Sequence, residues 1–415
     1  MDAFIYKSYF TKKKVKTDMN EKKRILTTVG LYHGFNDGAV VIIPILFPVF
    51  RELFDLSYTQ IGIITGGGLL ISLITQIIIG FASDKKNRRT LLSSGILLLS
   101  CSLLLIIQVQ NFLSLLLFIF VLRFASGFFH PVGVGWISKT FKKEKIDWAM
   151  GVQSALGDFG AFIGILTTAF IVELKGWSFP FYIWAIAGVI CLFSGLYITR
   201  NTNETYIENI KNKVEKESIR NIIKKEWKLL KKIKLFVPGS IISGTSWGMV
   251  VSYLPLLLVE KTTLSLPFIG IIISIWIGVG TIICIFYGKI ITFLSRKTIV
   301  IMSYFTMGVM AYLLTTVTNI FIIIIIMILL GISSFISFPA IFSYVSEITD
   351  DPTEGKTFGY IFTFQLGIGT LLLFFSGLTA DIWGIWTPFF ILGFFSLLTS
   401  LLFIVNRGKL RPISI

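Results

Sequence analysis

Five ionisable side chains stand inside otherwise apolar stretches of this sequence, and they are the groups with which the chain could do chemistry. The five are His33, Asp37, Arg123, His130 and Asp158. An ionisable group that has left water must face a partner or a cavity, because an isolated charge is expensive in an apolar medium. A guanidinium keeps its proton and can neutralise only one carboxylate at a time, so a second carboxylate is driven to bind a proton. A carboxyl group that binds and releases protons near neutral pH is what coupling to a proton gradient requires.

The spacing of these residues places them on shared helix faces and at a common depth. His33 and Asp37 are four residues apart, and Arg123 and His130 are seven apart, so each pair lies on one face of a helix. At about 1.5 Å per residue, Asp37, Arg123 and Asp158 each come out roughly 16 Å along their helices. That is near the middle of a hydrocarbon layer about 30 Å thick. We therefore predict a midplane cluster of two carboxylates and one guanidinium, with Asp37 the first choice as proton carrier and Asp158 the second.

Two alternatives concern these charged groups. Asp37 and Arg123 could form an ion pair that only holds the fold together. His33 and His130 come out nearer the inner membrane surface, and we place both, with Asn36, in the wall of a substrate cleft; His130 could instead only form a hydrogen bond near a helix break caused by the proline that follows it. The sequence shows no third ligand beside the two histidines, so we expect neither a metal nor a cofactor.

The elements that position these side chains follow from the composition. Of 415 residues, 54% are hydrophobic and 14% are charged, with a mean hydropathy of +0.82; a soluble domain carries about a quarter charged residues. Apolar runs of membrane-spanning length recur along the chain and do not alternate with polar residues, which favours helices over a β-barrel. The sequence predicts an all-α polytopic membrane protein with twelve transmembrane helices, at 25–50, 58–82, 90–109, 112–141, 147–173, 178–199, 236–260, 266–292, 298–318, 319–346, 355–381 and 386–406.

The two halves of the sequence repeat each other. When the chain is shifted by 208 residues, Arg88 meets Arg296 and Pro131 meets Pro339, and several glycines keep the same register. We therefore predict two parallel six-helix repeats around a central cleft, an architecture suited to alternating access. The second, fifth, eighth and eleventh spans are rich in glycine, so we expect them to join the halves, and we expect the third, sixth, ninth and twelfth to face lipid. The expected domains are a basic tail at 1–24, helical bundles at 25–199 and 236–408, a linker at 200–235 and a tail at 409–415.

Positive charge follows the topology of the spans. The net charge is +16, and nearly all of the 38 Lys and Arg residues fall on one side of the predicted membrane. Because basic loops stay in the cytoplasm, we expect a plasma-membrane protein with both termini cytoplasmic and no cleaved signal peptide. This distribution argues against nucleic acid as a partner.

The linker has a charge pattern of its own. Residues 219–232 combine apolar residues at helical spacing with many lysines, which predicts an amphipathic helix on the membrane surface; the alternative is a solvated charged linker. The partners we expect are a small-molecule substrate, protons, and anionic lipid at the basic tail and the linker. We expect the protein to be a monomer.

Charges at the inner ends of the spans predict a gate. The basic loop after the second span should pair with the acidic segment before the eleventh, and the basic loop after the eighth span should pair with Glu144 and Asp147 before the fifth. Such pairs would hold the inner face closed and break when it opens. The residues predicted to form the gate are Asp84, Arg88, Arg89, Arg296, Lys297, Glu347, Asp350, Asp351 and Glu354.

The second half carries no charge at a comparable depth. We expect it to contribute shape, aromatic surface and hydroxyl groups to a substrate site. The candidates are Trp247, Tyr253, Ser334, Ser337 and Gln365. For each of them ordinary core packing is the alternative, because aromatic and small polar side chains also fill space in any bundle.

Four motifs resemble those of known transporters. The loop Gly80-Phe-Ala-Ser-Asp84-Lys-Lys-Asn-Arg-Arg resembles the signature loop of the major facilitator superfamily, and with the spans and the repeat this resemblance covers about residues 25–408. The first span, His33-Gly-Phe-Asn36-Asp37, and the fourth, Phe129-His130-Pro131, resemble the fosmidomycin-resistance-like exporters of that superfamily. Arg123 followed by Gly127 is similar to a motif of its drug/proton antiporters. The resemblance implies proton-coupled export of small molecules through a central cleft.

Three functions stay open. The first is a secondary transporter that exports a drug-like or metabolite molecule in exchange for protons. The second is proton-coupled uptake of an anionic nutrient that Arg123 binds, since Ala161 follows Gly160 where the antiporters have proline. The third is a membrane sensor or lipid-handling protein that does not transport. We do not expect an enzyme, and the sequence has no Gly-Lys-Ser/Thr phosphate loop for nucleotide-driven transport.

Overall fold

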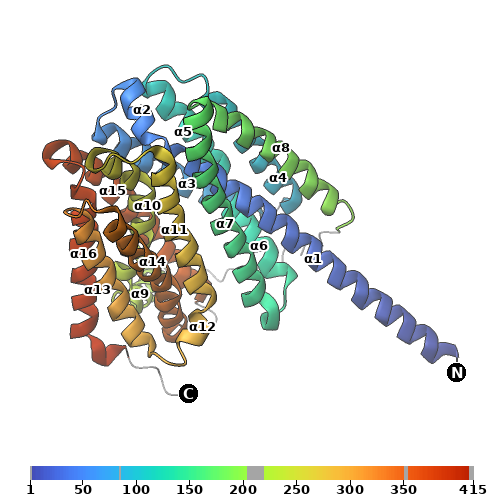
Figure 1. Cartoon of the computed structure of the whole chain (residues 1–415). Coiled ribbons are helices and arrows are strands. Elements are labelled where there is room, and N and C mark those ends of the chain that lie inside the picture. Colours follow the sequence, from blue (N-terminus) through green and yellow to red (C-terminus); the bar gives the residue numbers. More distant parts are fainter. Residues whose placement is uncertain (1, 84–85, 203–218, 350–353, 411–415) are drawn as a thin grey trace.

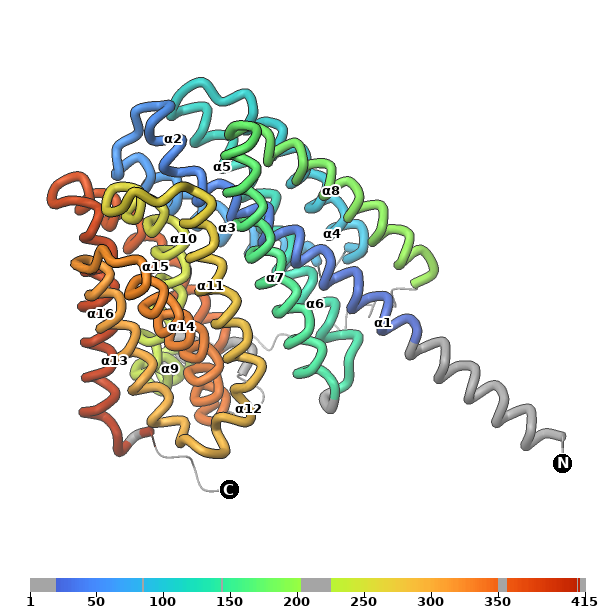
Figure 2. The backbone as a smooth tube through the Cα atoms, in the orientation of Figure 1, coloured from blue at the N-terminus to red at the C-terminus, as the bar shows by residue number. Residues whose placement is uncertain are grey.

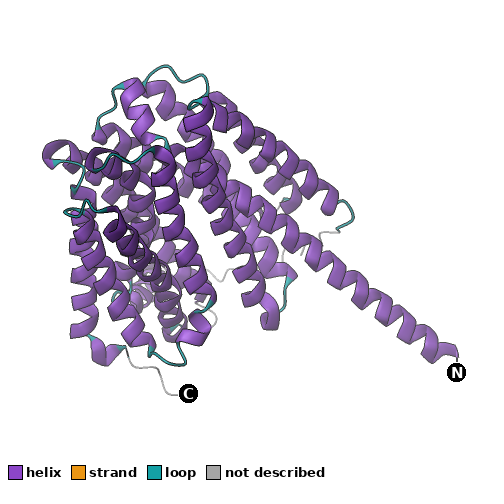
Figure 3. Ribbon diagram, in the orientation of Figure 1, coloured by secondary structure: helices purple, strands orange, loops and turns teal. Residues whose placement is uncertain are grey.

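The computed structural model describes residues 2–83, 86–202, 219–349 and 354–410. In these ranges the chain is built from helices and short connections, without strands (Figure 3). This confirms the predicted all-α class.

The helices follow the predicted spans closely (Figure 1). The first half contains α1 (Asp2–Ile45), α2 (Phe47–Phe54), α3 (Tyr58–Ser83), α4 (Arg88–Ile106), α5 (Phe112–Ser126), α6 (Phe129–Thr140), α7 (Lys143–Lys175) and α8 (Phe179–Ile198). The linker contains α9 (Ile219–Ile233). The second half contains α10 (Val237–Lys261), α11 (Leu266–Ile285), α12 (Tyr287–Ile290), α13 (Arg296–Leu314), α14 (Ile320–Ile348), α15 (Glu354–Trp383) and α16 (Thr387–Val405), followed by a short 3₁₀ turn, Arg407–Lys409.

Three predicted spans are each divided into two helices: 25–50 into α1 and α2, 266–292 into α11 and α12, and 112–141, next to a proline, into α5 and α6. The span at 112–141 breaks into α5 and α6 at Gly127 and Phe128. Pro131 has no N–H to donate to the carbonyl group four residues earlier, and its ring crowds that carbonyl, so the helix restarts near this point. Arg123 therefore lies in the last turn of α5, while His130 lies in the first turn of α6.

Eleven helical stretches of the described chain are long and apolar enough to cross a membrane. The predicted first span, α1, is not among them, because His33, Asn36 and Asp37 lower its hydropathy. It nevertheless lies within the bundle and packs along α7. α1 is thus the twelfth long helix of the bundle, and its polar residues are covered by protein.

The two halves meet along the helices that the glycine pattern selects. α3 packs along α15, and α7 packs along α11, whereas α4 pairs with α8 and α13 pairs with α16 within their own halves. α8 and α16 present large apolar side chains outward, among them Phe193 and Leu401. The α3–α15 and α7–α11 contacts confirm the predicted junction between the halves. The lipid-facing role of the third, sixth, ninth and twelfth spans stays a prediction.

Glycine permits close approach at two different kinds of contact. A Cβ atom on Gly62 of α3 would lie 2.8 Å from the carbonyl oxygen of Phe374 on α15, so this contact between the halves needs glycine. On α7, a Cβ atom on Gly160 would overlap the backbone of Gly34, and one on Gly164 would lie 2.5 Å from the carbonyl oxygen of Gly38. The α7 glycines therefore serve the packing of α1 inside the first half, and not the junction between the halves as the sequence suggested.

We predict that Gly160→Ala destabilises the protein by about 3 kcal/mol or more, because the added methyl group has no room against α1 and overpacking is costly. Thermal unfolding of the purified protein in detergent measures the effect. Gly151→Ala is the matched control on the same helix, since nothing lies within 4 Å of its Cβ position. Equal melting temperatures for the two variants would contradict the close α1–α7 contact.

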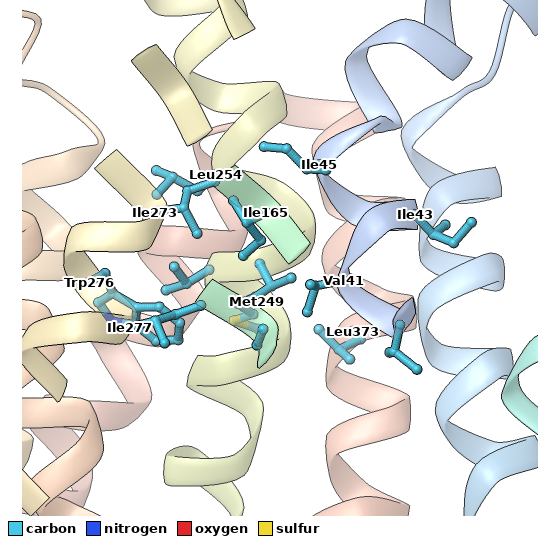
Figure 4. Packing of buried hydrophobic residues seen from close by; sticks show 14 of the residues in the cluster. Val41, Ile43, Ile45, Ile165, Met249, Leu254, Ile273, Trp276, Ile277 and Leu373 are labelled. Carbon is cyan, nitrogen blue, oxygen red and sulfur yellow. The ribbon is translucent and has the colours of Figure 1, made fainter. Parts of the chain in front are cut away.

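An apolar core closes the junction between the halves. Figure 4 shows Val41 of α1 and Ile165 of α7 gathered with Met249 of α10 and Leu373 of α15, and all four are buried. Burial of such side chains supplies the main favourable energy of packing inside the protein.

The bundle is joined at one face. At the face where α2 lies, which the basic residues predict to be the outer one, Arg51 Nη1 is 3.4 Å from Glu260 Oε1, and the hydroxyl group of Tyr58 donates a hydrogen bond to the same Glu260 oxygen. The carboxylate of Asp381, on α15, accepts hydrogen bonds from the backbone N–H groups of Tyr58 (2.8 Å) and Thr59 (2.7 Å) at the start of α3. We call Arg51, Tyr58, Glu260 and Asp381 the outer latch. At the opposite, inner face, the ends of α6 and α7 diverge from α11 and α12 (Figures 1 and 2).

Candidate functional site

His33 and Asp37 form a direct pair on one face of α1, as their spacing predicts. His33 Nε2 lies 3.1 Å from Asp37 Oδ2. The other ring nitrogen, Nδ1, lies 2.8 Å from the backbone carbonyl oxygen of Gln153 on α7, and Asn36 donates a 2.9 Å hydrogen bond to Asp37 Oδ1. Both side chains are therefore held in place by a second contact.

The geometry of His33 and Asp37 fits one proton between the two side chains. A carbonyl oxygen only accepts, so His33 Nδ1 must carry a hydrogen and donate it to Gln153. The 3.1 Å contact at Nε2 then requires a further proton, either on the imidazole or on the carboxyl group. Without that proton, a nitrogen lone pair would face a carboxylate oxygen, which is repulsive. The pair is thus a proton-binding site in which the proton, when present, completes a hydrogen bond.

His130 and Phe129 enclose the pair from α6. The His130 ring meets the His33 ring edge-on with centroids 5.4 Å apart, and Phe129 stacks on His33 at 4.4 Å. Possible ligand atoms of His33, Asp37 and His130 all lie within 4.8 Å of one another. The sequence argument that no third ligand stands near the two histidines is therefore wrong, because Asp37 occupies that place. The direct His33–Asp37 hydrogen bond already uses two of the three groups.

Asp158 lies on the same half but faces the second one. It lines a cavity of about 490 Å³ between α7 and α11, together with Trp148 and with Thr281 and Cys284 of α11. The carboxyl group is near enough to Asp37 to interact with it electrostatically. A second carboxyl group thus lies beside the proton-binding pair, at the junction with the other half.

Arg123 occupies a different cavity from the acids. Its side chain lines a central cavity of about 180 Å³, and its stem passes Gly68, where a Cβ atom would lie 3.0 Å from the arginine Cγ. Among the residues that the structure describes, Arg123 has no ion pair. Asp37 forms its direct contact with His33, and it acts on both Arg123 and Asp158 electrostatically without an ion pair to Arg123. The predicted midplane cluster of two carboxylates and a guanidinium stays a prediction. Arg123 and Asp158 line separate cavities.

The predicted residues of the second half divide into two groups. Trp247 and Gln365 line the central cavity. Tyr253 donates a 2.6 Å hydrogen bond to the carbonyl oxygen of Leu373, Ser337 is hydrogen-bonded to Ser243 at 2.6 Å, and Ser334 is buried; none of the three lines the cavity. For these three the structure shows the packing role that stood as the alternative.

Some of the predicted inner gate residues have contacts within their own halves in the described part of the chain. Arg296 at the start of α13 forms an ion pair with Glu347 at the end of α14, and Arg89 donates hydrogen bonds to Thr199 Oγ1 (3.0 Å) and to the carbonyl oxygen of Leu196 (2.7 Å). Glu347, one of the predicted partners of Arg88 and Arg89, thus pairs with Arg296 instead. The other predicted pairs across the halves stay a prediction. Arg88 and Lys297 begin α4 and α13. Asp84, Asp350 and Asp351 lie outside the described residues, as does the side chain of Glu354.

Sequence reasoning missed several contributors to these sites. The carbonyl group of Gln153 has no sequence signal, since every residue has one. Thr281 is a small polar residue within an apolar run and does not stand out. The outer latch had a weak signal: Arg51, Glu260 and Asp381 are charges at the outer ends of spans.

The sequence of this chain is similar to the sequences of known transporters. A profile of the Major Facilitator Superfamily matches residues 29–369 and 236–413. The chain is 26% identical over 178 residues to the uncharacterized MFS-type transporter YfnC of Bacillus subtilis, covering 42% of each protein. It is 27% identical over 152 residues to the fosmidomycin resistance protein of Escherichia coli, covering 37% of each. These matches span about two fifths of the relatives' length.

A solved structure supports the fold over a longer stretch. The crystal structure of the nucleoside transporter NupG superposes with a TM-score of 0.74 at 14% identity, covering 93% of this chain and 99% of that one. A likeness at this identity shows a shared fold and nothing of the substrate.

Proposed function

The chain belongs to the Major Facilitator Superfamily, and we propose that this multi-pass membrane transporter exports a drug-like or small metabolite molecule in exchange for protons. The observation that carries the proposal is the His33–Asp37 pair, whose geometry needs one proton to be complete. Asp158 stands beside it as a second carboxyl group that takes part in proton transfer. A transporter that couples to protons needs a buried group that is alternately charged and neutral.

The conformation supports alternating access. The outer latch joins the halves at the predicted outer face and the opposite ends diverge, which supports an inward-open arrangement. The contacts α3–α15 and α7–α11 are the surfaces on which the halves rock. In the opposite state the inner gate residues pair across the halves, and the outer latch is broken.

Transport driven by a pH gradient tests the proposal. The purified protein is placed in vesicles with an imposed gradient, an extract of small cellular metabolites is added, and the molecules that accumulate are identified by mass spectrometry. An exporter that exchanges substrate for protons concentrates its substrate in the acidic compartment, whatever the orientation of the protein in the vesicle. Accumulation in the alkaline compartment identifies uptake with protons, and accumulation that ignores the gradient excludes proton coupling.

The proposal also covers the orientation of the protein in the membrane and the role of the linker helix α9. We place the inner face in the cytoplasm and the protein in the plasma membrane, following the distribution of basic residues. On α9, Leu229 and Ile233 are buried, whereas Trp227 is 60% exposed and Lys231 lies 5.6 Å from its ring centre. An exposed indole among lysines suits an anionic lipid surface. Vesicles with and without anionic lipid in the same flux experiment test this, and equal rates would contradict it.

A further inference from the structure

The central cavity contains a guanidinium group that has no direct ion pair among the described residues, although Asp37 is near enough to act on it electrostatically. Arg123 enters it from the last turn of α5, and within the described part of the chain no carboxylate forms an ion pair with it. The acid that the sequence assigned to it, Asp37, is occupied by His33 and Asn36. A charge that is buried without a partner is expensive, so a protein keeps one where something else neutralises it for part of the time.

The rest of the cavity wall has the character of a ligand site. Trp247 and Gln365 line it from the second half, and the Gln365 side-chain oxygen is buried without a hydrogen-bond partner among the described residues. The remaining wall is mostly aliphatic, including Val40, Leu69 and Leu373. None of the described residues that line the cavity is acidic. An apolar pocket with a few convergent polar groups is the usual form of a small-molecule site.

We propose that this cavity binds a small organic anion. The acidic group of the ligand is held by Arg123, a polar substituent meets Gln365, and the apolar body lies against Trp247 and the aliphatic wall. At about 180 Å³ the cavity lies below the roughly 300–1,000 Å³ of pockets for drug-sized ligands, which selects a metabolite-sized molecule. The inference rests on the proposed function in that this anion is the transported substrate, in whichever direction it moves.

The proton and the anion then occupy separate sites on a shared helix. Val40 and Val41 of α1 line the cavity about one turn beyond Asp37. Protonation of the His33–Asp37 pair and binding of the anion therefore act on the same segment without competing for the same side chain.

Binding to the purified full-length protein in detergent tests the charge preference. The probes are phenylacetate, its neutral isostere phenylacetamide and the cation phenethylamine, at equal concentration, with sodium chloride as the inorganic control. We expect phenylacetate to raise the melting temperature and the other three to leave it unchanged. Equal shifts for the amide or for sodium chloride, or no shift with phenylacetate, would overturn the assignment.

The Arg123→Gln variant locates the site. Loss of a charge-assisted contact should weaken phenylacetate binding by about tenfold or more. Arg200→Gln is the matched control, because Arg200 stacks on Tyr197 after the end of α8 and does not line the cavity. This variant should bind phenylacetate as the wild type does. Unchanged affinity in Arg123→Gln would overturn the proposal.

A measurement on the unmodified protein covers the case in which Arg123→Gln does not fold. Phenylglyoxal modifies accessible arginine side chains, and mass spectrometry of the peptides reports each site. We expect phenylacetate to protect Arg123 and phenylacetamide not to do so; equal protection by both, or by neither, would overturn the proposal. The binding and flux experiments can fail separately. Anion binding without gradient-driven flux would contradict proton coupling and support this site. Gradient-driven flux of neutral molecules alone would support proton coupling and contradict this site.

Discussion

Asp37→Asn is expected to reduce pH-driven accumulation of the substrate to the level of vesicles without protein, while exchange of substrate at equal pH continues. Asparagine has nearly the same shape, and its amide N–H can donate to His33 Nε2, so the contact on α1 is kept. What is lost is the proton that the pair binds and releases. The measurement compares gradient-driven accumulation with exchange at equal pH in the same vesicle preparation.

Asp158→Asn is the companion variant for this experiment. If Asp37 is the proton carrier and Asp158 assists it, the second variant should slow gradient-driven accumulation without abolishing it. If both variants keep full gradient-driven transport, neither Asp37 nor Asp158 is the proton site. If Asp37→Asn also loses exchange at equal pH, Asp37 has a structural role in an ion pair and is not the group that couples transport to protons.

Asp381→Ala is expected to shift the protein from the inward-open toward the outward-open state. The carboxylate caps the first turn of α3 from the other half of the molecule, accepting two backbone N–H groups. Loss of such a cap costs about 0.5–2 kcal/mol, which corresponds to a change of roughly 2- to 30-fold in the ratio of the two states. The sign follows from the contact itself, which joins the halves only while the outer face is closed.

Labelling of the central cavity measures this shift. A cysteine placed at Ser252, in the cavity wall, is treated with a membrane-impermeant maleimide from the outer face. We expect faster labelling with Asp381→Ala than without it. Glu52→Ala is the matched control, because it removes an exposed acid from the same face outside the latch. Equal labelling rates in all three proteins would show that the Asp381 contact does not hold the outer face closed.

Hydropathy and glycine content predicted the helices and their partners well. The reasons are physical: lipid enforces long apolar helices, and small residues mark where two helices touch. The α3–α15 and α7–α11 contacts confirm this. The same pattern could not tell which neighbour a glycine faces. Gly160 meets Gly34 within its own half, because the rotation of α7 about its axis is set by all of its neighbours together.

The candidate site was predictable where it is local and not where it depends on helix rotation. His33 and Asp37 meet because a spacing of four residues fixes their positions on a single helix. The expected partner of Asp37, Arg123, sits on another helix, and equal depth says nothing of the direction in which each side chain points. The hydrogen bond to the backbone of Gln153, which reveals the shared proton, leaves no trace in the sequence.

Helix α7 touches α1 on one side and α11 on the other. The carbonyl group that orients His33 belongs to α7, and so does the carboxyl group that faces α11. A movement of the second half along α7 therefore changes the surroundings of the proton on α1. Thermodynamic reciprocity then applies. If protonation changes the free-energy difference between the two states of the halves, the change of state alters the free energy of proton binding by the same amount. In the proposed cycle, contacts along α7 therefore decide how tightly proton movement is linked to substrate movement.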